Sequence, residues 1–517
     1  MNILNKIIEN INYRSSIKKF TFHNNTIFNK KKKFNKKRII LMEHYPVWSS
    51  LIVYSYLSNA LSEKFNANII SYSPFQKNFF TKILYLISFK MGLHTFSITK
   101  SFGVKDILMP GNKTKKKKFK ILIDQVKKAK SKNEILNFKF FKIKIGDLLY
   151  DGYLYEKNEA TIILNDNFYK YAEKFIHLFL YWYELFNNYK ILGLIASHPV
   201  REYGIPLRIA TFSNIHSYTA SLTFIYKHTK KKINHAFFNY KNAFNQLPSK
   251  EKKIGVKLAK KELDLKFKGK QTKDTVERIG KKIKPVLQYK KLTKIKKRSK
   301  NILIALHSIY DAPHVYGNWV FLDQYEYLKF LGKKSNELKD FNWLVKIHPV
   351  LFDKEFNLVN DIIKNYPNLK ILNKNITNAE ILKRGVKCVL TAYGNISYEF
   401  GYLGIPSILC SKNHPFKGFE FIKDSSNIRE YNNILNNIKN LDYAINIKDI
   451  CKFYYIRFLK RGHMFPNFNE LCSKIGEQVN TPIIFEKWLE VADIKYHRKI
   501  NLKIKKFVKS NKFYLTE

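Results

Sequence analysis

Short apolar runs alternate with longer stretches of helical periodicity along most of this chain. Residues 38–43 and 68–72 are apolar runs of strand length, and residues 49–65 between them carry a helical pattern. Residues 191–197 form another apolar run, which ends at His198. Strands that alternate with helices are typical of a mainly parallel sheet covered on both faces. The first half is therefore predicted to be an α/β domain.

The other elements expected in the first half are mostly helices. They are helices at residues 75–93, 113–132 and 169–187, a short segment at 96–102 and a strand at 161–164. Two stretches are unusually apolar. Residues 175–186 are too few to span a bilayer, and residues 79–93 are interrupted by Lys82 and Lys90. Both stretches are predicted to be core helices.

A second α/β series begins at residues 301–306, after a weakly patterned, lysine-dense stretch at 248–300. Its strands are expected at 343–347, 369–372, 388–391 and 407–410, and its helices at 320–331, 355–365, 378–384 and 396–403. The fold class is therefore α/β, with two Rossmann-like domains facing a cleft. The expected division is a basic N-terminal extension (1–37), a first domain (38–247), a connection (248–300), a second domain (301–490) and a basic C-terminal tail (491–517).

Polar side chains follow several strands of the predicted second domain. In open α/β sheets, ligands bind beyond the carboxyl ends of the strands, so these residues are expected to face one crevice. The candidates for binding there are His307, Asp311, Lys346, His348, Pro349, Thr391, Gly394, Asn395 and Glu399. The convergence of several strand ends carries this prediction, because one such end alone would mean little.

Three of these positions suggest specific contacts. Gly394 lies between a strand and a helix, where the missing Cβ lets the backbone approach a phosphate; an ordinary turn is the alternative. Glu399 can accept hydrogen bonds from ribose hydroxyls, or it can be a simple first-turn acid. His348 ends a strand beside Lys346 and can donate to a phosphate oxygen, whereas a structural histidine is the alternative.

The first half contributes a second group of candidates. Asp147 and Asp151 are four residues apart and share a face if this segment is helical, so that either carboxylate can serve as general base toward an acceptor hydroxyl. A helix cap together with a solvated acid explains the pair equally well. His198, Arg201 and Arg208 follow a predicted strand and are candidates for holding an anionic acceptor or the donor phosphates.

Composition limits the remaining choices. The 517 residues carry a net charge of +54, which invites a nucleic-acid or anionic-membrane interpretation. The chain is rich in Lys, Asn, Ile, Phe and Tyr, the amino acids that AT-rich codons encode. Lysine is therefore expected at every surface position that tolerates it. The four cysteines form no CxxC pair and are expected to be buried thiols in a reducing compartment. We expect a cytoplasmic protein without a signal peptide, in peripheral contact with the inner membrane at most.

Several segments resemble one family. WLVKIHP and LTAYGNISYEFGYLGIPSILC resemble the C-terminal domain of bacterial surface-polysaccharide glycosyltransferases of the GT-B type with a His-Pro motif, which include capsule biosynthesis proteins. IGDLLYDGYLYE, SHPVREYGIPLRIA and LHSIYDAPHVYG add to a likeness that spans roughly residues 38–440. It implies a nucleotide-activated donor in the C-terminal domain, a sugar acceptor held by the N-terminal domain, and no bound metal.

The same resemblance implies roles for individual residues. His348 and Pro349 would contact the donor phosphate, while Gly394 and Glu399 would lie at the nucleotide. No position matches the catalytic base of a defined subfamily, so the choice between inversion and retention stays open.

The expected activity is transfer of a sugar from a nucleotide sugar, cytidine- or uridine-linked, to a glycan that can be lipid-linked. His348 would stabilise the departing phosphate, and Asp147 or Asp151 would act as base. No other cofactor and no metal ion is expected. The alternatives are a nucleotide-sugar epimerase of the same fold, a basic nucleic-acid-binding protein and a membrane scaffold without activity. Lysine is spread along the chain and no nucleic-acid-binding module appears, so a specific nucleic-acid partner is not expected.

Overall fold

The computed structural model describes most of the chain. The described residues are 13–28, 34–111, 116–221, 224–234, 236–270, 272, 289, 299–348, 351–441, 443–460 and 481–515. They form two compact units, each built from separate stretches of sequence. Unit 1 comprises Met1–Tyr150, Leu164–His235 and Gly462–Glu517, and unit 2 comprises Asp151–Ile163 and Ala236–Arg461.

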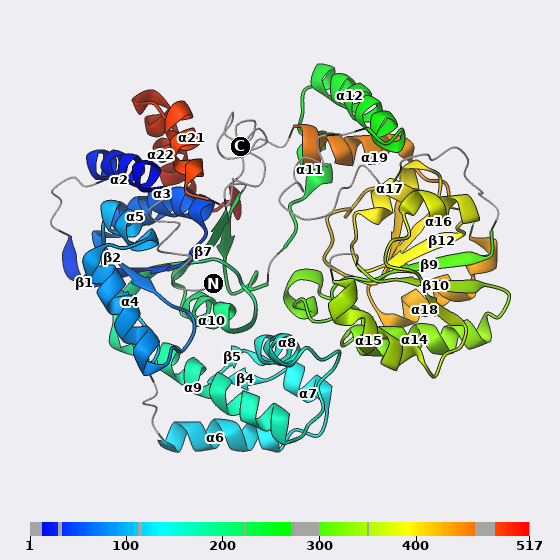
Figure 1. Cartoon of the computed structure of the whole chain (residues 1–517), viewed down its shortest axis with the longest axis horizontal. Helices are drawn as coiled ribbons and strands as arrows, with labels where there is room; N and C mark the ends of the chain where they lie inside the picture. Colours follow the sequence, from blue (N-terminus) through cyan, green and yellow to red (C-terminus); the bar gives the residue numbers. More distant parts are fainter. Residues whose placement is uncertain are drawn as a thin grey trace. The chain divides into compact units, whose positions relative to one another are not determined.

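Unit 1 is built on a seven-stranded sheet (Figure 1). Its strands are β1 (Asn35–Glu43), β2 (Ala67–Tyr72), β3 (Val104–Leu108), β6 (Lys190–Ala196), β7 (His216–Ser221), β8 (Phe224–His228) and β15 (Tyr514–Leu515), in the order β15-β8-β7-β6-β1-β2-β3. The five strands from β3 to β7 are parallel, and β8 and β15 are antiparallel to their neighbours. The order of the parallel strands reverses between β1 and β6.

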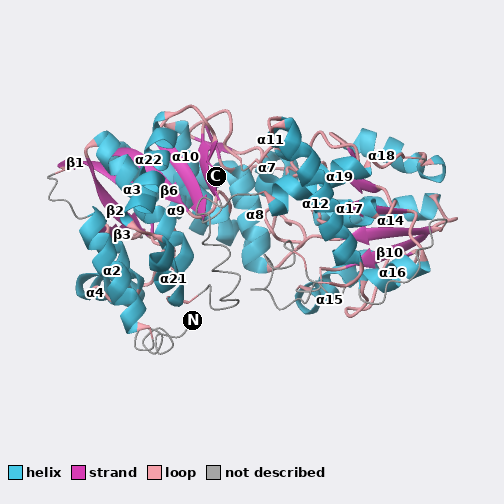
Figure 2. Ribbon diagram, turned by 90° about the horizontal axis from the view of Figure 1, so that it is seen from above, coloured by secondary structure: helices cyan, strands magenta, loops and turns pink. Residues whose placement is uncertain are grey.

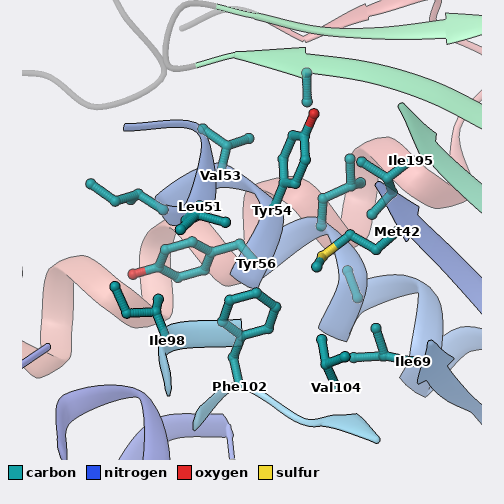
Figure 3. Packing of buried hydrophobic residues seen from close by; sticks show 14 of the residues in the cluster. Met42, Leu51, Val53, Tyr54, Tyr56, Ile69, Ile98, Phe102, Val104 and Ile195 are labelled. Carbon is teal, nitrogen blue, oxygen red and sulfur yellow. The ribbon is translucent and has the colours of Figure 1, made fainter. Parts of the chain in front are cut away.

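The core of unit 1 centres on α3 (Trp48–Phe65), whose apolar side chains are buried on all sides. A helix that is apolar all round must be covered all round. α3 packs against the sheet through β1, β2, β6 and β7, and against α5, α21 and α22 on other sides. Figure 3 shows its side chains Leu51, Val53, Tyr54 and Tyr56 among Met42, Ile69, Ile98, Phe102, Val104 and Ile195.

Both predicted basic extensions are wrong, because their described residues fold into unit 1. α2 (Arg14–Phe28) buries Ile17 and Phe20, and the Phe20 ring stacks on Phe485 of α21 (Ile483–Val491) with 4.3 Å between ring centroids. α22 (Ile494–Lys509) buries Ile500 and Ile504, and β15 extends the sheet. Apolar residues at helical spacing form the buried stripe, and the lysines between them lie on the solvent face.

The remaining elements of the first half flank the sheet. They are α4 (Phe79–Met91), α5 (Thr95–Ser101), α6 (Lys116–Lys127), α7 (Lys132–Leu136), β4 (Lys139–Phe140), β5 (Ile143–Lys144), α8 (Gly146–Lys157), α9 (Asp166–Asn188), η1 (Arg201–Tyr203) and α10 (Gly204–Phe212). The predicted core helix at 175–186 is confirmed within α9, whereas no strand forms at 161–164. The predicted core helix at 79–93 is wrong, since α4 buries only Phe89.

Unit 2 contains a six-stranded sheet that is parallel throughout. Its strands, β10 among them, are magenta in Figure 2. Its strands are β9 (Asn301–Ala305), β10 (Asn342–Lys346), β11 (Leu369–Ile371), β12 (Cys388–Thr391), β13 (Ser407–Leu409) and β14 (Ile422–Asp424), in the order β11-β10-β9-β12-β13-β14. Numbered along the unit, this is 3-2-1-4-5-6, the order of the dinucleotide-binding Rossmann fold. The α/β fold class with two Rossmann-like units is therefore present.

The helices of unit 2 begin earlier than the expected domain boundary. They are α11 (Tyr240–Asn245), α12 (Ser249–Phe267), η3 (Pro313–Gly317), α14 (Gln324–Glu337), α15 (Phe352–Ile363), α16 (Asn378–Arg384), α17 (Ile396–Tyr402), α18 (Ile428–Asn436), η4 (Ile438–Asn440), α19 (Ile447–Tyr454) and η5 (Tyr455–Leu459). α12 lies inside the predicted lysine-rich connection, yet its Ala259, Leu263 and Phe267 belong to the core of unit 2. The described part of 248–300 is thus an integral part of this unit.

Candidate functional site

Two loops meet where the strand order of unit 2 reverses. His307 follows β9, Gly394 follows β12, and these two strands are neighbours in the sheet. The backbone N–H of Tyr393 donates to His307 Nε2 at 3.4 Å, and a Cβ added at Gly394 would lie 3.6 Å from the same nitrogen. The structure thus brings these two predicted strand ends together at the topological switch point, where open α/β sheets bind ligands.

His307 is held in its neutral form at this edge. Burial and the nearby charge of His348 lower the pKa of His307 to about 4. Because Nε2 accepts from the Tyr393 N–H, the single ring proton is assigned to Nδ1. His348 itself is exposed and lies two residues after β10, which is the other neighbour of β9 in the sheet. Pro349, the other half of the predicted His-Pro pair, lies outside the described residues.

The turn at Gly394 is lined by hydroxyl groups. A Cβ at this position would lie 3.1 Å from Thr391 Oγ1, so the turn is tight even for alanine. Thr391 Oγ1 and Ser397 Oγ are buried, and neither makes a hydrogen bond within the described structure. Buried polar groups normally have partners. Asn395 precedes α17 without capping it, and α17 has only seven residues, so its dipole adds little here.

Lys346 ends β10 inside a buried hydrogen-bonded network. Its Nζ donates to Asn378 Oδ1 at 2.6 Å, and Asn378 Nδ2 donates to the Tyr289 hydroxyl at 3.1 Å. That hydroxyl in turn donates to Glu399 Oε2 at 2.7 Å. Burial lowers the pKa of Lys346 from 10.5 to about 8, against the opposing effect of Glu399 and Glu380.

Glu399 therefore points into the protein, and the geometry argues against its predicted contact with a ribose. Lys266 Nζ on α12 donates to Glu399 Oε1 at 2.8 Å, while Tyr289 holds the other oxygen. The side chains of Lys266 and Glu399 are only 3% and 8% exposed. A carboxylate with one oxygen in a buried ion pair and the other accepting from a tyrosine hydroxyl anchors α17 to α12. Nothing in the local sequence marks Lys266, which lies in the stretch predicted to be a connection.

Asp151 and Asp311 lie near the same edge. Burial, followed by the charges of Asp311, Tyr316 and Asp151, raises the pKa of Tyr393. Asp311 is exposed on the loop after β9. Asp151 is buried in α8, where its Oδ1 lies 2.5 Å from His314 Nδ1.

His314 was given no role in the sequence analysis. Its Nε2 lies 2.6 Å from the carbonyl oxygen of Leu322, and since a carbonyl only accepts, Nε2 is the donor. His314 belongs to η3, a π-helix, and the residues that flank η3, Ala312 and Asn318, have φ values of 41° and 45°. Such π-helical turns are frequent at functional sites. The pairing of His314 with Asp151 becomes visible only in three dimensions.

Asp147 and Arg208 engage each other, which argues against both of their predicted roles. Arg208 donates from NH1 to Asp147 Oδ1 at 3.0 Å and from NH2 to Oδ2 at 2.9 Å. The guanidinium also donates to the Lys144 carbonyl at 2.9 Å. Their side chains are 3% and 2% exposed. A fully buried bidentate pair supports the packing of α8 on α10 and presents neither a base nor a cation to a substrate.

His198 and Arg201 lie together after β6 in unit 1. Burial and the adjacent charge of Arg201 lower the pKa of His198 to about 4. The His198 ring contacts those of Tyr45 and Tyr203, with centroid distances of 5.5 Å and 5.8 Å. Arg201 begins η1 with a left-handed φ of 51°. Anion binding by this pair stays a prediction.

Glu43 is the notable residue that sequence reasoning missed. It ends β1 at the switch point of the unit 1 sheet, where β6 is the neighbouring strand. Ser197, just after β6, donates its backbone N–H to Glu43 Oε2 at 2.6 Å and its hydroxyl to Oε1 at 2.7 Å. Burial raises the pKa of Glu43 from 4.5 to about 7, although both hydrogen bonds lower it. A carboxylate at the end of the first strand was the available signal.

Glu43→Gln is expected to change how stability depends on pH. A raised pKa means that the folded state holds the proton more tightly, so the free energy of unfolding falls as pH rises from about 4.5 to about 7. The raised pKa corresponds to a loss of about 3 kcal/mol in the free energy of unfolding across this pH range. The variant should therefore be more stable than the wild type near pH ~8 and equal to it near pH ~4. Urea unfolding across this range measures the effect; Glu486→Gln, on the surface of the same unit, is the control. Parallel profiles for Glu43→Gln and the wild type would contradict the assignment.

Comparison with known proteins gives structural matches only. No family model matches the sequence, and no curated protein matches it. The chain is similar to KpsC, a beta Kdo 2,4 transferase of Thermosulfurimonas dismutans, with a TM-score of 0.30 and 9% identity over 51% of this chain and 79% of that one. It is also similar to UDP-GlcNAc 2-epimerase from Neisseria meningitidis bound to UDP-GlcNAc, with a TM-score of 0.23 and 10% identity over 88% of this chain and 99% of that one. A glycosyltransferase from Rickettsia africae matches with a TM-score of 0.23 and 11% identity over 93% of this chain and 100% of that one. At these scores the matches identify no residue and no activity in this chain.

Two features are absent from the described residues. None of their helices is long and apolar enough to cross a membrane. No three or more of their His, Cys, Asp and Glu side chains are grouped so that they could hold a metal ion. Of the four cysteines, Cys388, Cys410 and Cys451 are free and buried, as predicted, and Cys472 lies outside the described residues.

Proposed function

We propose that this chain is a glycosyltransferase that binds a nucleotide-activated sugar at the carboxyl edge of the unit 2 sheet. One observation carries the proposal: His307 and the Gly394 turn are in contact where the 3-2-1-4-5-6 strand order reverses. The alternation of strands and helices in both units supports a fold that handles nucleotides. The expected products are bacterial surface polysaccharides, on the strength of the segments around His348 and Gly394 that resemble such enzymes.

The side chains at this edge suit a departing phosphate. Cleavage of the bond between sugar and phosphate leaves negative charge on the phosphate, and preorganised donors that face this charge accelerate the step. His348 is an exposed imidazole at this edge, whereas the Lys346 ammonium is buried against Asn378 and acts on the phosphate through its charge, from within the protein. The hydroxyls of Thr391 and Ser397, which have no partner within the described structure, are further donors in reach of the turn.

Asp151 remains the proposed base of this reaction, since Asp147 is committed to Arg208. Asp151 contacts His314 of η3, and a Cβ added at Gly317, the last residue of η3, would lie 2.9 Å from Cε1 of Tyr393, the residue before Gly394. His314 fixes one of the Asp151 oxygens, which orients the other. A base in this position would take the proton of the acceptor hydroxyl as the new glycosidic bond forms.

Thermal unfolding in the presence of nucleotide sugars tests the proposal. We expect one class among CMP-, CDP-, UDP-, GDP- and dTDP-sugars to stabilise the protein, by about 2.7 kcal/mol at a hundred times its dissociation constant. The nucleoside of the stabilising donor is expected to be cytidine or uridine. His348→Ala and Gly394→Val should both reduce the shift, the first by removing a donor and the second by filling the turn. Lys370→Ala, at an exposed position of β11, should leave it unchanged.

The outcomes separate this proposal from its rivals. No stabilisation by any nucleotide sugar would reject it, and so would a shift that His348→Ala and Gly394→Val leave intact. Incubation of the protein with the stabilising sugar alone tests the second activity. An isomerised sugar recovered without any acceptor would assign an epimerase in place of a transferase.

A further inference from the structure

One helix of unit 1 presents its apolar side to solvent. α4 begins at the N-cap Asn78, whose side chain accepts from the Thr81 N–H, and ends at Gly92, where φ is 63°. Phe79 and Phe80 are 71% and 77% exposed, and Met91 is 67% exposed. The other large exposed apolar residues of this helix are Ile83, Leu84, Leu86 and Ile87, and Leu93 follows just after it. Single exposed apolar residues are ordinary, whereas a contiguous group this large marks an interaction site.

The exposed residues form one continuous face. At 100° per residue, positions 79, 80, 83, 84, 86, 87 and 91 fall within one arc of less than half the circumference, and Lys90 is the one polar side chain inside it. The opposite side holds the helix on unit 1. There, Tyr85 and Phe89 contact Phe96 of α5 edge-on, with ring centroids 5.8 Å and 5.7 Å apart. α4 is thus fixed on α5, beside which it lies in Figure 1, and its most apolar side chains are exposed.

The charge around this face has one sign. Between Glu63 and Asp106 the sequence contains six lysines and no acidic residue. Lys77 lies over the ring of Tyr85, with 5.0 Å from Nζ to the centroid, and Lys100 lies over the ring of Phe89 at 5.5 Å. Lys100 Nζ also donates to the carbonyl of Lys90 at 3.0 Å. Lys77 and Lys100 thus lie at the two ends of the packed side, whereas Lys82 lies beside the exposed apolar arc and Lys90 lies within it.

We propose that α4 docks unit 1 on the surface of an anionic lipid bilayer. An apolar helix face bordered by lysines matches the boundary between acyl chains and acidic headgroups. Thirteen residues extend about 20 Å, less than the hydrocarbon core, so the helix lies in the interface and does not cross it. A second copy of this chain is a poorer occupant, because a two-fold interface through this face would bring the lysines of both copies together. The inference is independent of the proposed transferase activity.

Flotation of the full chain with lipid vesicles tests this surface. We expect the protein to float with vesicles that contain phosphatidylglycerol, to float far less with phosphatidylcholine alone, and to be released by salt. Ile83→Gln/Ile87→Gln removes two exposed side chains one turn apart and should lower the partition coefficient about tenfold or more. Ile254→Gln/Leu258→Gln on α12 is the matched control: two exposed aliphatic residues at the same spacing, whose loss should leave flotation unchanged.

Each other result would overturn the proposal. Failure to float with anionic vesicles would do so, as would equal flotation of both double variants or equal binding to neutral and anionic lipid. Light scattering tests whether a second copy of the chain occupies this face instead. A dimer that dissociates in Ile83→Gln/Ile87→Gln, in a protein that does not bind vesicles, would assign the face to a second copy. The stabilisation of Ile83→Gln/Ile87→Gln by a nucleotide sugar should match that of the wild type, so a failure here is distinct from a failure of the transferase proposal.

Discussion

Replacing Arg208 by methionine is expected to lower the free energy of unfolding by about 3–5 kcal/mol. The guanidinium makes two hydrogen bonds to Asp147 in a fully buried pair, so its removal leaves a carboxylate without its charge partner in the interior. The lost bond to the Lys144 carbonyl adds to the effect. Urea-induced unfolding followed by circular dichroism measures the change.

Two further variants show whether the charge pair is responsible. Arg498→Met, at an exposed position of α22 in the same unit, should shift the urea midpoint little. Asp147→Leu/Arg208→Met removes both charges and should recover much of the loss, because an apolar pair avoids the desolvation of two ions. If the single and double variants were equally destabilised, packing would be the cause and not the unpaired charge.

Lys266→Met is expected to destabilise the protein by about 3 kcal/mol and to abolish the thermal shift with nucleotide sugars. Its ammonium holds Glu399, and Glu399 is in the helix that follows Gly394. Without Lys266 the buried carboxylate retains Tyr289 and the charge of Lys346, so α17 is expected to shift and to carry the Gly394 turn with it.

Lys261→Met is the matched control, since Lys261 is an exposed residue of α12. Lys266→Met/Glu399→Gln removes the buried charge and should recover part of the stability. A double variant that regains stability but not nucleotide binding would show that the turn needs the ion pair for its geometry. Full nucleotide binding in Lys266→Met would instead contradict a link between this ion pair and the site.

Much of unit 2 could be predicted from the sequence because its strands are buried on both faces. Such strands are short continuous apolar runs, and the predicted 388–391 coincides with β12. α16 also has the predicted bounds. Thr377 and Glu380 form a capping box at its start and Gly385 ends it, so the limits of this helix are local properties of the sequence.

The errors arose where partners are distant in sequence. α22 is lysine-rich, and only the position of α3 decides that Ile500 and Ile504 are buried. α12 was interpreted as a connection for the same reason. In α4 the error is the reverse: an apolar run predicts a covered helix, and the structure leaves most of its apolar side chains exposed.

The candidate site shows the same division between local and distant information. That His307 and Gly394 would lie at one edge followed from strand order, which local patterns indicate. The partners of Glu399, Asp147 and Arg208 could not be predicted in this way. Their ion pairs join residues that are 133 and 61 positions apart in the chain, and such pairs leave no mark in composition or spacing. A charged residue near a strand end can serve the ligand or the fold, and only its neighbours distinguish the two.

The return of the chain to unit 1 has a consequence for how the protein is made. Trp488 and Phe507 belong to the core around α3, and β15 completes the sheet, yet all of them follow unit 2 in sequence. The ribosome therefore synthesises the strands of unit 2 before it synthesises the C-terminal helices and strand that complete the core and sheet of unit 1. Unit 2 can therefore fold during translation, whereas unit 1 can complete its core around α3 only after the last residues of the chain are made.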